Sequence, residues 1–151
     1  MLHPSQLRLS FDATDAVCRA TLLWDAAPRT CAAVVGLLPI RGLVHQAIYS
    51  GSESVLTLPQ LVKLDKENAT SAVRRGDLAF TWLAAGSSYG VAQDFAELCW
   101  FYDHDAQPRM WEGPVEVNVF ARLVEPADAF YAMCRRLRRE GVKPLTVEAA
   151  P

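Results

Sequence analysis

The stretch of residues 25–53 constrains the fold most, because it changes from helical to strand periodicity within a short span. Its first apolar residues recur at helical spacing and predict a helix of about three turns: Cys31, Val34, Val35 and Leu38. Pro28 suits the first turn of that helix, and Pro39 cannot continue it. A strand rich in polar side chains is expected to follow, which places the helix inside a mainly β chain.

Most of the remaining chain alternates apolar and polar residues, as half-buried strands do. Strands are expected at about 7–11, 17–24, 42–50, 53–58, 78–82, 95–102 and 115–124, with an irregular stretch at 59–75. A second helix is expected between Asp128 and Gly141. Successive strands with few crossover helices favour a closed antiparallel β-barrel with the two α-helices covering its ends. We expect one domain over residues 1–151, because no repeat or linker divides the chain.

Charge and hydropathy argue against nucleic-acid and membrane partners. The chain has 15 Lys and Arg against 17 Asp and Glu, a formal net charge of −2, so no global field attracts polyanions. The only dense basic run, Arg135–Arg139, is interpreted as the solvated face of the last helix. Residues 1–11 lack the apolar core of a signal peptide, and no segment is long enough to span a bilayer, so a cytoplasmic protein is expected.

The four cysteines are scattered through apolar segments and are expected to be buried free thiols. The chain lacks zinc-ligand spacings, phosphate-binding glycine loops and nucleophile elbows, so we expect no cofactor. A metal site would have to be assembled from His45, Glu53, Glu67 and His104. These residues have none of the usual spacings, and no metal is predicted.

Several short motifs, in this order, resemble those of cyclophilins and of small bacterial cyclophilin-like proteins of uncharacterised function. Ala27-Pro28-Arg29-Thr30 and Val44-His45-Gln46 resemble the early core of cyclophilins. The motifs that resemble the small bacterial group are Glu67–Thr70, Gly76–Phe80 and Ser88–Gly90. The resemblance covers residues from about 5 to 124. It implies a cyclophilin-like barrel.

The same resemblance places Gln46 where cyclophilins carry the arginine that hydrogen-bonds the twisting prolyl peptide. A neutral amide cannot supply a charge-assisted hydrogen bond, which is roughly twice as strong as a neutral one. The resemblance therefore implies a protein without appreciable prolyl isomerase activity.

His45, Tyr49 and Glu53 share one face if residues 43–53 form a regular strand. Ala47 and Gly51 lie between them and leave room for a ligand, although such small residues also suit close packing against the first helix. The pattern favours a small-molecule pocket. If the protein is an enzyme, His45 is the candidate acid or base, and Glu53 would orient it.

Four further residues complete the predicted ligand-binding set: Gln46, Glu67, Asn68 and Tyr89. Glu67 and Asn68 lie in the long irregular stretch, where binding residues are common and where Asn also forms turns. Tyr89 follows a core strand and would either line the site or cover the core.

An alternative function belongs to a different class. The loop Arg109–Pro114 carries Met110 and Trp111, which are typical anchors of protein interfaces. The chain would then be an assembly module that forms a homo-oligomer or docks on a partner enzyme. A loop tryptophan also commonly covers its own core, so both interpretations stay open.

Overall fold

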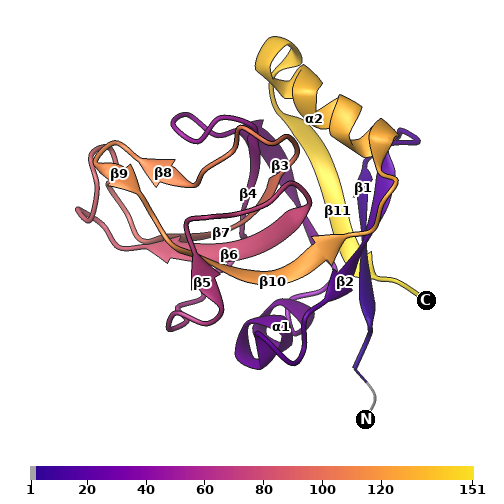
Figure 1. Cartoon of the computed structure of the whole chain (residues 1–151), viewed down its shortest axis with the longest axis horizontal. Coiled ribbons are helices and arrows are strands. Elements are labelled where there is room, and N and C mark those ends of the chain that lie inside the picture. The colour runs from indigo at the N-terminus through magenta and orange to yellow at the C-terminus, as the bar shows by residue number, and fades with distance from the viewer. Residues whose placement is uncertain (1–2) are drawn as a thin grey trace.

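Eight antiparallel strands close into a barrel in the computed structural model, which describes residues 3–151 (Figure 1). They are, around the barrel, β2 (Val17–Leu22), β1 (Gln6–Phe11), β11 (Lys143–Ala149), β3 (Ile40–Gln46), β4 (Glu53–Thr57), β7 (Phe95–Phe101), β6 (Asp77–Leu83) and β10 (Val117–Leu123). The pairing of β2 with β10, which sets Leu22 opposite Ala121, closes the sheet. The prediction of a mainly β, closed antiparallel barrel is confirmed.

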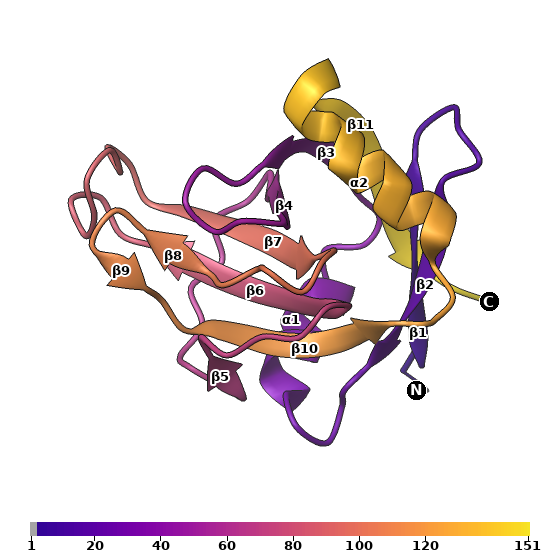
Figure 2. The same ribbon diagram turned by 45° about the horizontal axis from the view of Figure 1, so that its top comes forward.

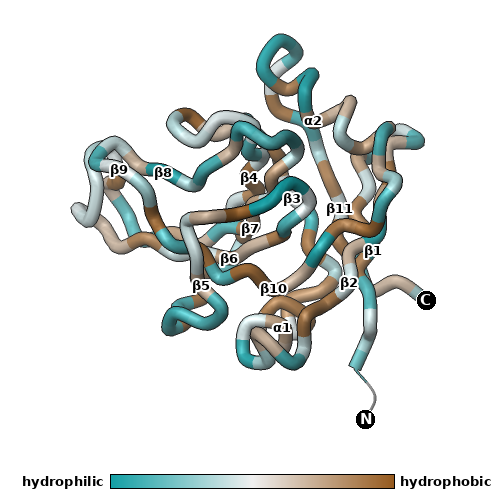
Figure 3. Tube along the Cα trace, viewed as in Figure 1, coloured by the Kyte–Doolittle hydropathy of each residue, from teal (hydrophilic) through white to brown (hydrophobic). Residues whose placement is uncertain are grey.

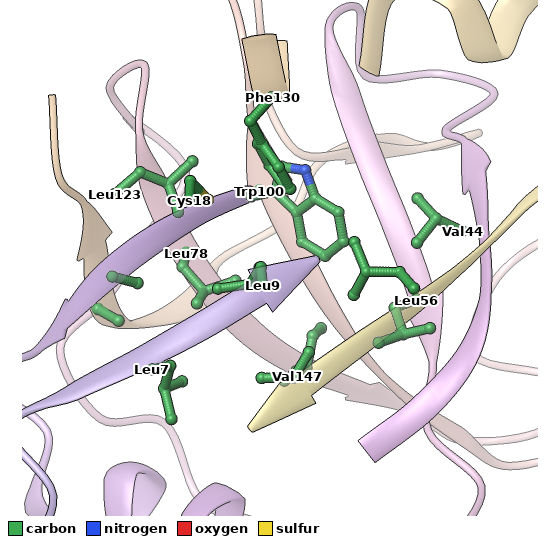
Figure 4. Packing of buried hydrophobic residues seen from close by; sticks show 14 of the residues in the cluster. Leu7, Leu9, Cys18, Val44, Leu56, Leu78, Trp100, Leu123, Phe130 and Val147 are labelled. Carbon is green, nitrogen blue, oxygen red and sulfur yellow. The ribbon is translucent and has the colours of Figure 1, made fainter. Parts of the chain in front are cut away.

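The barrel interior is packed with apolar side chains. On β4 and β7 the even-numbered residues face inward, so that Leu56 lies beside Leu98 in the pairing of these strands. Trp100 lies at the centre of the core and is fully buried (Figure 4). Its ring centroid is 5.9 Å from that of Phe130. A core of this kind holds few voids larger than a water molecule.

Two helices cover opposite ends of the barrel, α1 (Pro28–Val35) near β10 and α2 (Asp128–Glu140) near β3 and β11 (Figures 1 and 2). The predicted apolar stripe of α2 is buried, and Gly141 ends the helix at a φ of +83°. In Figure 3 the end of α2 is hydrophilic, whereas the middle of β10 is hydrophobic. Each helix buries one face against the barrel and exposes the other.

The structure differs from the sequence prediction in its short and late elements. Strand β11 was not predicted, although Leu145 and Val147 alternate inward as a strand requires. Pro144 within this run lacks an N–H and argues against a central strand. The strands β5 (Ala69–Thr70), β8 (Arg109–Met110) and β9 (Gly113–Pro114) were also not predicted; β8 and β9 form a hairpin where a loop was expected.

Other sequence predictions concern side chains and the chain start. All four cysteines are buried and free, as predicted. In the basic run, Arg135 pairs with Asp103 at 2.9 Å and Arg136 with Glu140 at 2.8 Å. No helix within residues 3–151 is long and apolar enough to cross a membrane. Met1 and Leu2, part of the N-terminal stretch considered above, lie outside the described residues.

Glu67 holds the N-terminus of α1, which has no capping side chain of its own. Its carboxylate accepts hydrogen bonds from the backbone N–H and the hydroxyl of Thr30, both at 2.8 Å. Arg29 Nε donates a further bond at 3.1 Å. Burial raises the pKa of Glu67, but the hydrogen bonds from Thr30 and Arg29 outweigh it and lower the pKa to about 2. A negative charge here also complements the positive end of the helix dipole.

We expect Glu67→Gln to lower the free energy of unfolding by about 1–2 kcal/mol at pH 7, because the helix loses a charged cap. The folded-state pKa lies below the ordinary value of 4.5, so this stabilisation is present above pH 4.5 and lost as the pH falls towards 2. Urea denaturation of both proteins at pH 7 and pH 3 measures the difference. Glu148→Gln, at the exposed pair with Arg8, is the control with a smaller expected effect.

Candidate functional site

The pairing of β4 with β7 exposes a row of side chains on the outer face of the barrel. Glu53 lies opposite Phe101, and Thr57 lies opposite Glu97. Because successive residues alternate between faces, both glutamates point outward, away from the packed interior. Together with the end of β3 and the β8–β9 hairpin, they border a pocket of about 130 Å³.

His45, Tyr49 and Glu53 all line this pocket, as the sequence pattern predicted. They do not lie on one regular strand as predicted, because β3 ends at Gln46 and residues 47–52 form a turn. Gly51 has a φ of +72°, and a Cβ there would lie 2.8 Å from the backbone oxygen of Asp105. The turn and the close approach of the Asp105 backbone therefore explain the glycine at position 51, whereas room for a ligand does not. The roles of the three lining residues in binding stay predictions.

Burial shifts the pKa values of the three acid–base groups in the pocket. Glu53 is only 4% exposed, and burial raises its pKa despite contacts with Ser50 and Cys99 that favour the charged form. Burial, with the charge of Glu53, raises the pKa of Glu97 to about 8. Burial lowers the pKa of His45. A neutral imidazole and a protonated carboxyl group therefore face one space at neutral pH.

Glu97 was not among the predicted site residues. The signal in the sequence was a single acidic residue within the apolar run 95–102. Its outward position opposite Thr57 depends on the register of β4 with β7, which the sequence does not specify. Among the described residues, no hydrogen bond joins His45 to Glu53, so the expected orientation of the imidazole by Glu53 is absent.

Gln46 lies on the face of β3 opposite to His45. Its amide nitrogen donates to the carbonyl oxygen of Gly51, and its amide oxygen accepts from the hydroxyl of Tyr102, each at 2.5 Å. These bonds tie β3 to the turn and to β7's end. Gln46 is therefore not part of the pocket in which the sequence analysis placed it.

Three more predicted site residues also lie outside the pocket. The carboxylate of Glu67 binds the N-terminus of α1. Asn68 adopts a φ of +48° and donates its side-chain N–H to the carbonyl of Val119 at 2.9 Å, which is the turn role considered as its alternative. Tyr89 is 71% exposed, and its ring is tilted against that of Trp111 in the hairpin. The predicted convergence of these three residues with His45 and Glu53 is wrong.

The β8–β9 hairpin forms an aromatic rim beside the pocket. The ring centroid of Trp111 lies 6.2 Å from that of Tyr49 and 5.8 Å from that of Tyr89. Glu112 accepts a hydrogen bond from the backbone N–H of Tyr89 at 2.9 Å, which ties the hairpin to the neighbouring loop. Trp111 is 67% exposed. It does not cover the barrel core.

No group of three His, Cys, Asp or Glu side chains within residues 3–151 is placed to hold a metal ion. His45, Glu53, Glu67 and His104, the four weighed as ligands from the sequence, do not form such a group. The chemistry that the pocket offers is proton exchange and charge, supplied by the imidazole of His45 and the carboxyl groups of Glu53 and Glu97.

Comparison with known proteins gives one family and a shared fold. A family model described as "Protein of unknown function (DUF3830)" matches residues 9–149. No curated protein matches significantly. Similar solved structures include McbB in complex with tryptophan (TM-score 0.67, 15% identity, 94% of this chain and 44% of McbB).

Two further solved structures are similar over nearly the whole chain. The solution structure of the hypothetical protein AF2241 from Archaeoglobus fulgidus has a TM-score of 0.59 and 21% identity, covering 97% of this chain and 95% of AF2241. The Mimivirus cyclophilin has a TM-score of 0.55 and 9% identity, covering 95% and 86%. The cyclophilin-like fold predicted from the sequence is thereby confirmed. The chain spans less than half of the McbB chain.

We expect Glu97→Gln to stabilise the protein at pH 8–9 and to leave its stability nearly unchanged at pH 5. The folded-state pKa of Glu97, about 8, lies above its ordinary value of 4.5. The folded protein then binds the proton more tightly, and the wild type loses stability as the pH rises from 4.5 through 8. Glutamine imitates the protonated acid, and its advantage at pH 9 should be on the order of 1–3 kcal/mol.

Urea denaturation between pH 5 and pH 9 measures this difference. Glu116→Gln, at an exposed position on the segment before β10, is the control variant. Equal stability of wild type and Glu97→Gln at pH 9 would contradict the raised pKa of Glu97.

Proposed function

The chain belongs to the DUF3830 family of unknown function, and we propose that it binds a small molecule in the pocket bordered by His45, Glu53 and Glu97. The observation that supports this proposal best is the gathering of three ionisable side chains with displaced pKa values around one concave space. Structural ion pairs do not explain the gathering, because neither glutamate belongs to any ion pair within the described residues. Perturbed titrations of this kind cluster at functional sites.

Stability alone does not favour two carboxyl groups at this position. Burying a carboxyl group away from water costs free energy unless hydrogen bonds or a counter-charge compensate it. Val55 and Cys99, the neighbours between the two glutamates on the same face, are apolar, so apolar residues also fit there. Function is the natural reason to retain the acidic pair.

The dimensions suit a small metabolite or one group of a larger one. An engineered cavity of about 150 Å³ holds benzene, and this pocket measures about 130 Å³. Apolar side chains such as Phe95 and Met110 line it beside the polar ones. Should a reaction follow binding, His45 would act as the proton acceptor.

A second candidate function is supported by the exposed aromatic hairpin. Trp111, Tyr89 and Ile48 are 67%, 71% and 84% exposed beside the pocket, an apolar surface of the kind that protein interfaces use. A homo-oligomer or a complex with a partner enzyme would bury it. Such an interface is compatible with a ligand in the pocket.

The binding proposal is tested by thermal unfolding against a panel of metabolites. A ligand at 100 times its Kd adds about 2.7 kcal/mol to the stability of the folded state. Because the McbB structure is a complex with tryptophan, aromatic amino acids belong in the panel. Ala47→Leu, which fills the pocket, should abolish the stabilisation, whereas Ala32→Leu on the exposed face of α1 should preserve it. Stabilisation that survives Ala47→Leu would place the ligand elsewhere.

We expect negligible prolyl isomerase activity in the wild type and in Gln46→Arg. Residue 46 lies opposite to the pocket face and bonds Tyr102 and Gly51, so an arginine there would not reach a substrate bound beside His45. A protease-coupled assay with proline peptides and a genuine cyclophilin as the positive control measures the activity. Acceleration comparable to that of the control, in either protein, would contradict this expectation.

A further inference from the structure

Within the described part of the chain, no cationic side chain forms an ion pair with either carboxyl group of the pocket. Eight ion pairs join charged side chains within residues 3–151, and none includes Glu53 or Glu97. Glu53 is 4% exposed and borders the pocket, so water solvates its carboxyl group poorly. A cation that enters the pocket would meet two acidic groups in a site of low polarity, where their attraction is strongest.

The other walls suit an organic cation. Tyr49 lines the pocket, and its ring centroid lies 6.2 Å from that of Trp111 with an interplanar angle of 67°. Aromatic faces attract ammonium groups, and the apolar lining by Val55 and Phe95 accommodates a hydrocarbon part. The absence of a three-ligand cluster in the described part of the chain makes a bare metal ion a poorer match.

The other charged or titratable groups around Glu97 do not neutralise its carboxylate. His45, on β3, is neutral at pH 7 because burial lowers its pKa, and Cys99, on β7, is a buried thiol with a raised pKa. Arg109, on the hairpin, lines the pocket but donates to the amide oxygen of Gln107 at 3.0 Å. Among the described residues Arg109 forms no ion pair with a carboxylate, so its charge is available to a carboxylate of the ligand.

We propose that the ligand carries a protonated amino group, bound between Glu53 and Glu97 and against the ring of Tyr49. This inference rests on the proposed function and adds the chemical class of the ligand. Simple amines and amino acids share this chemistry. An amino acid would add a contact between its carboxylate and Arg109, so the two sources differ in their dependence on that residue.

Binding of an ammonium group should release a proton from Glu97. In the free protein its pKa of about 8 keeps the carboxyl group mostly protonated at pH 7. An ammonium group favours the ionised carboxylate, so binding lowers this pKa and releases a proton. Affinity should therefore rise by up to about tenfold per pH unit between pH 6 and pH 8 and level off above pH 8.

Calorimetric titration of the full chain with benzylammonium tests the inference, with benzyl alcohol and benzoate as neutral and anionic analogues of similar size. Buffers with different ionisation enthalpies at pH 7 report the released proton. We expect benzylammonium to bind at least about tenfold more tightly than either analogue, a difference of about 1.4 kcal/mol. Phenylalanine forms the amino-acid arm, and Arg109→Gln should weaken the binding of phenylalanine but not that of benzylammonium, which meets one like charge fewer in the pocket.

Variants of each glutamate separate charge from shape. Glu97→Gln should abolish proton release and weaken benzylammonium at pH 8, and Glu53→Gln should weaken it as well; Glu148→Gln, distant from the pocket, should change nothing. If benzyl alcohol or benzoate binds as tightly as benzylammonium, or if Glu97→Gln retains full affinity at pH 8, the ammonium inference is wrong while the proposed pocket stands. If neither these probes nor the metabolite panel binds, the proposed function fails with it.

Discussion

Closure of the sheet by the pairing of β2 with β10 is the constraint on which the rest of the structure depends. A closed barrel has no free edges, and every strand then has one face inside and one outside. The interior is filled mainly by large apolar groups around Trp100, which leaves little room for polar side chains. The ionisable groups Glu53 and Glu97 lie on the outer face of these strands, where loops and hairpins shelter them from water.

The pocket follows from this placement. Glu53 and Glu97 project outward from neighbouring strands, and the turn after β3 and the β8–β9 hairpin rise around them. Shelter by these segments removes water from the carboxyl groups and raises their pKa values. The same elements thus create both the concave shape and the unusual electrostatics. A cost in stability above pH 4.5 accompanies the arrangement, as is common where a site is built for binding rather than for packing.

The sequence predicted the barrel well because period-two alternation marks both faces of most strands. It predicted the shared location of His45, Tyr49 and Glu53, but through a regular strand that ends at Gln46 in the structure. The roles of residues in long loops, such as Glu67, could not be predicted from strand alternation. Glu67 caps α1, and its partner Thr30 lies 37 residues away in sequence. Glu97 escaped prediction because its place in the site depends on strand register, a non-local property.

Strand register also decides how the cyclophilin resemblance should be interpreted. Adjacent residues on a strand face opposite sides, so a match between short motifs in which His45 and Gln46 are neighbours cannot by itself tell which of them faces a ligand. In this barrel His45 faces the outer pocket, and Gln46 bonds Tyr102 on the other face. An arginine that contacts a substrate must lie on the substrate's side of the sheet. The fold is therefore shared with cyclophilins, while the outer face presents an imidazole and two carboxyl groups, a set suited to charge and proton exchange.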